Sequence, residues 1–150
     1  MTPNIDERLA SLIRSLGQVV LPHLPPEASL AQEQVHLALG HLQILRAQID
    51  SAPAFEAEEA AGAAGHARAL ADLGGPGAPA LAATLADGAT DHPRERVTAL
   101  HDAIDHYIAA AWTDGDSAHR AAVTELVLAY EDVRVQKDRA WCAPFGFDRA

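Results

Sequence analysis

The sequence predicts an all-α protein, and both its composition and its periodicity lead to that prediction. Hydrophobic residues make up 49% of the 150 residues, and many of them are alanine, the strongest helix former. Aromatic residues reach only 5%, and the β-branched and aromatic side chains that favour strands are sparse. We therefore expect a single domain over residues 1–150, folded as a helical bundle of four main helices with a short or alanine-rich extra helix and an aromatic C-terminal tail.

The first predicted helix covers about residues 3–21. It begins with Pro3 at the first helical position, or one step later with Asn4 and Glu7 as a capping box. Three prolines in residues 22–26 end it, because proline cannot continue a helix. One apolar stripe at helical spacing faces a core, formed by Ile5, Leu9, Leu12, Leu16 and Val19.

A second helix over about residues 27–49 carries an unbroken apolar stripe, and we expect it at the centre of the bundle. Leu30, Leu37 and Ile44 widen the stripe. A stripe this wide contacts more than one neighbouring helix. The positions that repeat with coiled-coil spacing are Ala31, Val35, Ala38, Leu42, Leu45 and Ile49.

The third predicted helix follows a break at residues 51–53 and extends to about Leu73. Its first turns contain glutamates, which suit the positive end of a helix dipole. Glycine within the helix is destabilising unless a neighbour packs closely, so we expect either a small-residue contact helix or a loosely packed one. Residues 74–77 stop this helix, and residues 79–86 form a short additional helix.

Two long helices complete the prediction, over about residues 93–112 and 117–139. Pro93 suits the first position of the earlier helix. The Asp-Gly-Asp-Ser turn at residues 114–117 separates the two helices and supplies an N-cap. Two consecutive helices joined by so short a turn are expected to pack against each other.

The last helix and the tail contain the candidate contacts with another protein. A helix with two apolar faces has two packing partners, and the second face here has seven-residue spacing. Residues 139–150 are predicted to be an irregular tail whose aromatic side chains need burial on the same bundle or on another subunit. The candidate partner or subunit contacts are Ala121, Leu128, Val135, Trp141, Phe145 and Phe147.

Charge and apolar runs restrict the partners and the compartment. Eleven Lys and Arg against twenty-one Asp and Glu give a net charge of -10, which repels nucleic acid and anionic lipid. No apolar run reaches the roughly 18 residues of a membrane span, and no signal-peptide pattern opens the chain. Cys142 is the single cysteine, so an internal disulfide is excluded. We expect an acidic cytoplasmic protein without nucleic-acid or membrane contact.

The sequence contains no complete catalytic or metal-binding motif. It has no Walker loop, no dinucleotide-binding turn and no paired cysteines. Glu33 and His36 have the Glu-x-x-His spacing of metal-binding bundles, but they fall on the polar face, and no second such motif completes a pair. We therefore expect no metal, no cofactor and no catalytic residue.

His101 and Asp105 are the best candidates for a ligand site. At about 100° per residue both border the apolar stripe of their helix, and Trp112 lies on the same flank. A His–Asp pair at this spacing fixes the imidazole tautomer and raises its pKa, which suits a general base or a metal ligand. The simpler interpretation is a boundary histidine bonded to its own helix neighbour.

His119, Arg134 and Lys137 share the inward face of the last helix. Buried charge is costly unless it is paired, so these side chains extend to solvent, pair within the chain or bind an anion. If the last two helices are antiparallel, Arg134 lies near the N-terminal half of the preceding helix and His119 lies near Trp112. In that arrangement Asp91, Glu95 or His101 is the expected partner of Arg134. An intramolecular salt bridge is the simpler interpretation, and a carboxylate or phosphate pocket is the functional one.

Two segments carry a resemblance to a known family. Residues 19–26, Val-Val-Leu-Pro-His-Leu-Pro-Pro, and residues 33–42, Glu-Gln-Val-His-Leu-Ala-Leu-Gly-His-Leu, resemble small helical bacterial proteins. Those proteins are often encoded beside aminoglycoside-phosphotransferase-like kinases and acyl-CoA dehydrogenases, and they also place a Val-Leu-Pro-x-Leu hinge between two helices. The resemblance covers about a third of the chain. It implies a bacterial accessory protein and brings no catalytic residues.

Two functions of different classes remain open. The first is a non-catalytic accessory protein that self-associates, as a homodimer, or accompanies a protein partner, because one small bundle does not cover all of its apolar faces. The alternative is a small-molecule-binding or metal-dependent bundle enzyme that uses His101 and Asp105 with help from His119 or Arg134. Binding of a metal or an anionic metabolite to the native protein would raise its stability.

Overall fold

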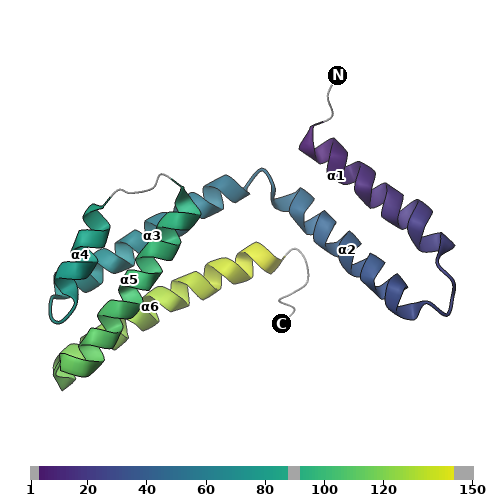
Figure 1. The fold of residues 1–150 in the computed structure, drawn as a ribbon. Helices are drawn as coiled ribbons and strands as arrows, with labels where there is room; N and C mark the ends of the chain where they lie inside the picture. Colours follow the sequence, from purple (N-terminus) through teal and green to yellow (C-terminus); the bar gives the residue numbers. More distant parts are fainter. Residues whose placement is uncertain (1–3, 88–91, 144–150) are drawn as a thin grey trace. The chain divides into compact units, whose positions relative to one another are not determined.

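In the computed structural model, which describes residues 4–87 and 92–143, the chain is helical and the described residues contain no strand (Figure 1). The all-α prediction is confirmed. Contacts divide the chain into two compact units, Met1–Pro53 and Ala54–Ala150, a division that the sequence did not indicate. The elements are α1 (Ile5–Arg14), the π-helical η1 (Ser15–Val20), the 3-10 helix η2 (Leu21–His23), α2 (Ser29–Gln48), α3 (Ala52–Leu73), α4 (Ala78–Ala86), α5 (Pro93–Asp114) and α6 (Ser117–Cys142).

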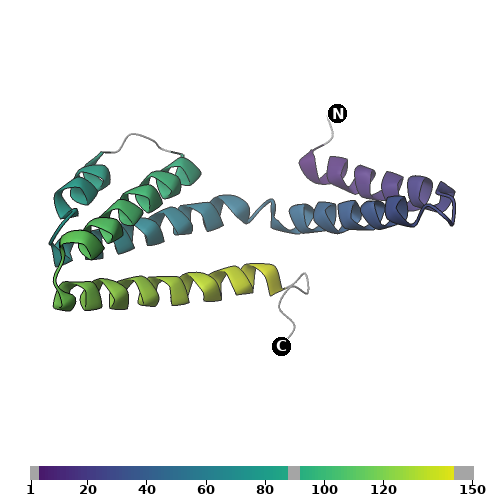
Figure 2. The same cartoon turned by 60° about the horizontal axis from the view of Figure 1, so that its bottom comes forward.

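Unit 1 is a helical hairpin in which α1 and α2 lie side by side (Figure 2). The capping box at its start forms as predicted, because Asn4 accepts a hydrogen bond from the Glu7 amide at 2.8 Å and Glu7 accepts one from the Asn4 amide at 2.9 Å. The end of α2 is tied to the start of α1 by Arg46, whose Nη2 donates to Asp6 Oδ2 at 3.0 Å. The hydrogen bonding of Asp6 with Arg46 holds the pKa of the Asp6 carboxyl below its usual range.

The prediction that α2 is the central helix is wrong. Within unit 1, α2 packs against α1 and η1, and no described residue of the unit is buried. Val35 and Leu42 of the a/d stripe are half-buried. Leu30 and Leu37 remain exposed. One side of the apolar stripe on α2 is therefore partly covered within unit 1, and the side with Leu30 and Leu37 is left exposed.

Unit 2 contains the buried core, and α3 contributes more to it than the sequence suggested. Alanine at 63 and 67 is fully buried, because small side chains let neighbouring helices approach closely. Of the two alternatives for this helix, its buried residues fit the small-residue contact helix and not the loosely packed helix of the overall prediction. The core consists of Ala63, Ala67, Leu70, Leu81, Leu100, Ile104, Tyr107, Ala111 and Val123.

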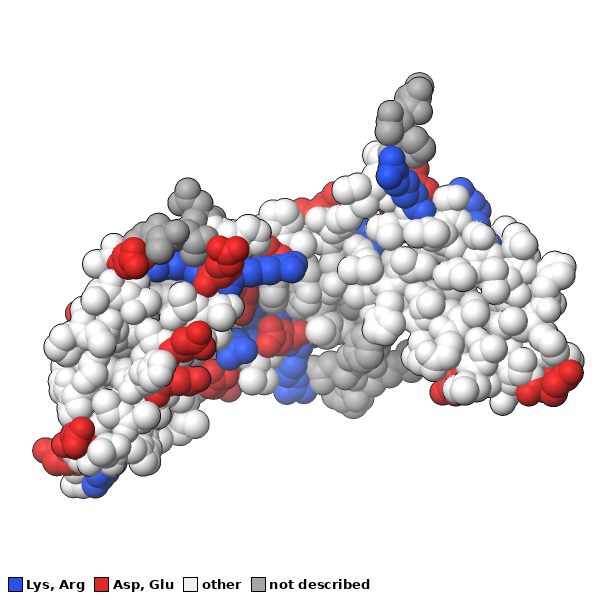
Figure 3. Space-filling view, in the orientation of Figure 1, with Lys and Arg blue, Asp and Glu red and all other residues white. Residues whose placement is uncertain are grey.

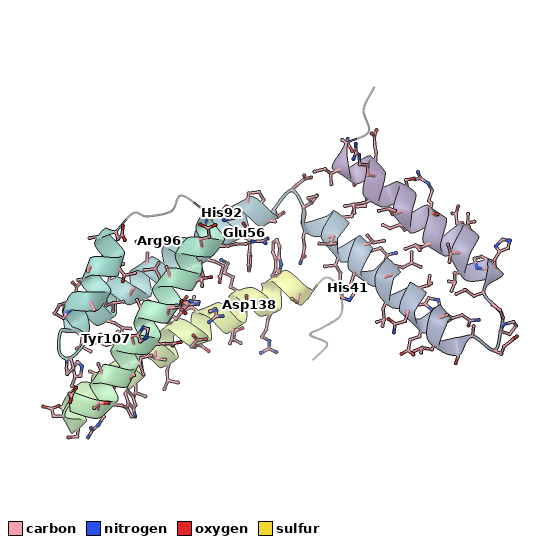
Figure 4. The ribbon with its side chains drawn as sticks, in the orientation of Figure 1. His41, Glu56, His92, Arg96, Tyr107 and Asp138 are labelled. Atoms are coloured by element: carbon pink, nitrogen blue, oxygen red, sulfur yellow. The ribbon has the colours of Figure 1, made fainter. Side chains whose placement is uncertain are left out.

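A glycine loop connects α3 to α4. Gly74, Gly75 and Gly77 all have positive φ, a conformation that glycine adopts without steric cost. Tyr107 reaches this loop from α5 (Figure 4), and its hydroxyl donates to the Gly74 carbonyl oxygen at 2.7 Å. The loop is thereby fixed to the core, and α4 begins at residue 78, close to the predicted start.

The C-terminal end of α4 is capped by Arg96 from α5 (Figure 4). Its guanidinium donates to the carbonyl oxygens of Thr84 at 3.0 Å, Leu85 at 2.9 Å and Asp87 at 2.7 Å. The last carbonyls of a helix lack partners within the helix and carry partial negative charge. A cation from a neighbouring helix therefore satisfies them and joins α4 to α5.

We expect Arg96→Gln to destabilise α4 by about 1.5–3 kcal/mol, the usual contribution of hydrogen bonds to a charged group. Amide hydrogen exchange in α4 measures this loss. Arg94→Gln is the matched control, because the Arg94 side chain is exposed and pairs with Glu56 of α3 and not with the end of α4. Ion pairs of exposed side chains contribute about 1 kcal/mol or less. Equal protection of α4 in the two variants would contradict the capping role of Arg96.

The sequence predicted the start of α6 correctly but placed its end too early. Asp116 caps its start by accepting from the His119 amide at 2.8 Å, as the turn signal predicted. Its end lies at Cys142, so residues 139–142, expected to be irregular, are helical. Phe145 and Phe147 lie outside the described residues. Among the described residues, no helix combines the length and apolar character needed to cross a membrane.

Candidate functional site

A cavity of about 270 Å³ lies among α3, α5 and α6 in unit 2. Its wall combines apolar side chains with an unusual concentration of polar and ionisable ones. Of the nine residues that line the cavity, α3 contributes one, and α5 and α6 contribute four each. The lining residues are His66, His101, Ile104, Asp105, Ile108, Val127, Tyr130, Glu131 and Arg134.

Tyr130 is held between two histidines from different helices. The His66 ring stacks on the Tyr130 ring with centroids 4.3 Å apart and an interplanar angle of 2°. On the other side, His101 Nε2 and the Tyr130 hydroxyl oxygen are 3.2 Å apart, within hydrogen-bond distance. The three rings therefore connect α3, α5 and α6 through side chains.

Burial controls the ionisation of this cluster. His66 is only 7% exposed, and burial lowers its pKa, against a smaller raising effect of Glu131 and with a smaller lowering effect of His101. Burial also raises the pKa of the Tyr130 hydroxyl. At neutral pH the site therefore contains a neutral imidazole and a protonated phenol, both able to donate and to accept hydrogen bonds.

The lowered pKa of His66 predicts that unit 2 loses stability in mild acid. The unfolded chain takes up a proton near pH 6.5, whereas the folded chain resists it, so stability is complete above that pH and falls as the pH drops toward the folded pKa. The loss is at most about 1.4 kcal/mol per pH unit. Urea unfolding at pH 7.5 and 5.5 measures it.

A matched pair of variants isolates the contribution of His66. His66→Asn is expected to flatten the acid loss, because the substituted side chain does not titrate. His106 is exposed on α5 and does not line the cavity, so His106→Asn should keep the wild-type dependence. An unchanged acid loss in His66→Asn would show that another group is responsible.

Arg134 finds its partner on its own helix. Its Nη1 lies 3.2 Å from Glu131 Oε1 and 3.5 Å from Oε2. The sequence suggested Asp91, Glu95 or His101 as its partner across the interface. Asp91 lies outside the described residues, and His101 shares the cavity wall with Arg134. The simpler interpretation, an intramolecular salt bridge, is therefore met by one guanidinium nitrogen, Nη1. The ion pair does not involve Nε or Nη2.

The structure gathers three of the five predicted ligand-binding residues. His101, Asp105 and Arg134 all line the cavity. Trp112 is exposed on α5 and is not among the lining residues. His119 lies beside Tyr107, with Nε2 at 3.4 Å from the hydroxyl, and so supports the glycine loop.

His66, Tyr130 and Glu131 are the members of the site that the sequence analysis missed. His66 carried a usable signal. It lies at helical spacing with Ala63 and Leu70, so it shares their face of α3, and a histidine in an otherwise apolar stripe is a candidate buried polar group. Tyr130 lies at seven-residue spacing from Val123 on α6, a pattern that indicates a core position and no more.

The predicted contact residues on α6 divide into two groups. Ala121, Leu128 and Val135 are exposed, with Leu128 at 64%. Trp141 instead stacks on Phe55 of α3 with ring centroids 4.3 Å apart. The aromatic side chain of α6 at this position therefore packs within unit 2.

Lys137 reinforces the same junction between α3 and α6. Its ammonium lies 3.0 Å from Glu59 Oε1 and 4.3 Å from the centre of the Phe55 ring. This is the intramolecular pairing that the simpler interpretation of the α6 cations predicted. The junction holds the two helices together near the cavity, whose wall includes Tyr130 and Arg134 from the same stretch of α6.

The chemistry of the site favours hydrogen bonding over metal binding. Within residues 4–87 and 92–143, no group of three or more His, Cys, Asp or Glu side chains is placed to hold a metal ion. Comparison with protein-family models, curated proteins and solved structures finds no match.

Proposed function

We propose that the protein is a non-catalytic cytoplasmic protein that acts by self-association, and that two copies pair through the helical hairpin of unit 1. The supporting observation is the exposed apolar surface of that hairpin. None of its described residues is buried, and large apolar side chains are exposed along both helices. These are Ile5, Leu12, Val19, Val20, Leu30, Leu37 and Leu45.

A helical hairpin without buried residues gains stability when a partner covers its apolar side chains. Each large aliphatic side chain that moves from water into an interface contributes about 1.5–3 kcal/mol. Ordering the backbone costs about 1–2 kcal/mol per residue, which two helices without a buried core do not offset by themselves. Contiguous apolar surface on a folded protein usually marks an interaction site.

Charge favours a second copy as the partner. Three basic and five acidic residues give residues 1–53 a formal charge of -2, whereas eight basic and sixteen acidic residues give residues 54–150 a charge of -8. Helix α2 has only two Asp, Glu, Lys or Arg residues, Glu33 and Arg46. Figure 3 shows the surface over α1 and α2 largely free of charge, and acidic side chains gathered over unit 2. Two hairpins can therefore meet without strong repulsion.

The size of the hairpin also suits a dimer. Helix α2 has 20 residues and is thus about 30 Å long, and neighbouring helices lie about 10 Å apart. With the 10 residues of α1 and the 6 of η1 beside it, the face of the hairpin covers roughly 500 Å² before the relief of the side chains is counted, somewhat less than the roughly 800 Å² per partner of a standard interface. Two hairpins related by a twofold axis form a four-helix bundle with a shared apolar core.

The exposed line on α6 is a weaker candidate for the subunit contact. Leu128 and Val135 are exposed, but α6 already contributes Val123 to the core of unit 2 and does not need a further partner to be held. Acidic residues such as Glu125 and Asp132 flank the line. Two copies of this surface would bring like charges together, which opposes self-association.

We expect the double variant Leu30→Gln and Leu37→Gln to be monomeric at concentrations where the wild type is dimeric. Glutamine matches leucine closely in helix propensity, and both leucines are exposed in the single chain, so the substitutions remove contacts with the second copy and leave the contacts within the chain unchanged. Light scattering coupled to gel filtration measures the mass, and circular dichroism checks the helix content.

Leu128→Gln on α6 is the matched control and should leave the dimer intact, because its leucine is equally exposed but lies on the other unit. If Leu128→Gln dissociates the protein and the α2 variant does not, the association is real but the hairpin is the wrong surface. A wild-type chain that stays monomeric at high concentration overturns the proposal itself.

A further inference from the structure

His66 offers hydrogen-bonding capacity that the fold does not use. It is more than nine-tenths buried, and within the described residues its ring has a stacking partner, Tyr130, but no hydrogen-bond partner. The described residues contain no fully enclosed side-chain nitrogen or oxygen that lacks a partner. Each imidazole nitrogen therefore keeps some exposed surface, and His66 is one of the residues that line the cavity. A group held in this way is available to a molecule in the cavity.

We propose that this cavity binds a small carboxylic acid with a short apolar chain. The carboxylate would meet Arg134, whose pairing with Glu131 occupies only Nη1. The other edge of the guanidinium, formed by Nε and Nη2, retains the parallel N–H groups that bind carboxylates in two-point fashion. No other hydrogen bond or ion pair of Arg134 occurs within the described residues.

The histidines add donors beside the arginine. A neutral imidazole carries one N–H, so His66 can donate to a carboxylate oxygen. A phenol that donates to Nε2 of His101 leaves the proton of that ring on Nδ1, which makes His101 a second N–H donor. Neutral donors stabilise an anion without the desolvation cost of another buried charge.

Two carboxylates in the cavity wall make an amine the alternative ligand. Counted without the histidines, Asp105, Glu131 and Arg134 give the cavity a formal charge of -1, which would favour an amine. Asp105, however, is exposed to solvent, and Glu131 is already paired with Arg134. The donors are thus more enclosed than the acceptors, and this difference selects the anion.

The volume of the cavity and the apolar part of its wall indicate the length and the character of the ligand's chain. A volume of about 270 Å³ corresponds to roughly nine water molecules at about 30 Å³ each. Ile104, Ile108 and Val127 form the apolar side. A carboxylic acid with a chain of about six carbons matches both the volume and the division of the wall into polar and apolar parts.

The full-length protein should be titrated with hexanoate and, separately, with hexylamine, which has the same chain and the opposite charge. The imidazole carbon-bound protons of His66 and His101 are followed by NMR. We expect saturable shifts of both histidines with hexanoate and none with hexylamine. Saturation with hexylamine in preference to hexanoate, or the absence of saturable shifts with either probe, overturns the proposal.

Arg134→Gln should weaken hexanoate binding at least about tenfold. Arg134→Lys keeps the charge but loses the two-point geometry, so we expect an intermediate affinity. Arg68→Gln is the control, because Arg68 is exposed on α3 and is not part of the cavity wall. Unchanged binding in Arg134→Gln, with its melting curve and histidine signals preserved, would show that Arg134 does not hold the ligand and would also overturn the proposal.

Discussion

Leu100→Ala is expected to remove about 2–5 kcal/mol from the unfolding free energy of unit 2. Leu100 is fully buried on α5, and truncation to alanine removes apolar contacts and leaves a cavity that the surrounding helices fill only in part. A loss of this size is a large fraction of the stability of an ordinary domain. Urea unfolding should therefore show an early transition or an unfolded unit 2.

The measurement can be confined to unit 2. The two tryptophans, Trp112 and Trp141, both belong to it, so their fluorescence follows the unfolding of this unit. Leu128→Ala is the matched control, because Leu128 is 64% exposed and exposed truncations usually change stability by no more than about 0.5 kcal/mol. If the two truncations cost the same, the core is not where the structure places it.

The helices themselves could be predicted from sequence because their boundaries depend on neighbouring residues. The Asn4–Glu7 capping box, Pro93 at the start of α5 and Asp116 at the start of α6 all occur where the sequence indicated. Each of these signals acts within one helical turn. The same reasoning found the short helix α4, since glycines bracket it on both sides.

The identity of the core could not be predicted in this way. An apolar stripe shows that a helix face is suited to burial, but not which neighbour covers it. The stripe of α2 is long and rich in leucine, yet no residue of α2 is buried within the chain. Helix α3 has smaller side chains and a weaker stripe, yet Ala63, Ala67 and Leu70 are buried. Small residues bury completely because they allow close approach, which a pattern based on large side chains underestimates.

The candidate site shows the same limit. His101, Asp105 and Arg134 were brought together correctly, because α5 and α6 follow each other across a short turn and their facing positions can be calculated. His66 was missed since its helix lies far away in sequence, and its place beside Tyr130 depends on how α3 packs against α6. Sequence periodicity gives the face of a helix but not its distant neighbour.

Gly75→Ala is expected to destabilise unit 2 by about 2–3 kcal/mol, and the effect has two separable parts. The first is conformational, because Gly75 has a φ of +83°, where a β-carbon costs about 1–2 kcal/mol. The second is steric, since the new β-carbon would lie 2.5 Å from the His119 ring and would force that ring to move. Moving it also disturbs the contact of His119 with the Tyr107 hydroxyl, 3.4 Å away.

Gly74→Ala separates the two parts. Gly74 has nearly the same backbone conformation, with a φ of +77°, but a β-carbon there meets nothing within 4 Å. We therefore expect Gly74→Ala to lose only the conformational part, about 1–2 kcal/mol. In a His119→Ala background the steric part disappears, so Gly75→Ala should then cost no more than Gly74→Ala. If Gly75→Ala keeps its larger cost without the imidazole, then the ring of His119 does not limit the side chain at position 75, and the glycine loop is fixed mainly by the hydrogen bond from Tyr107 to Gly74.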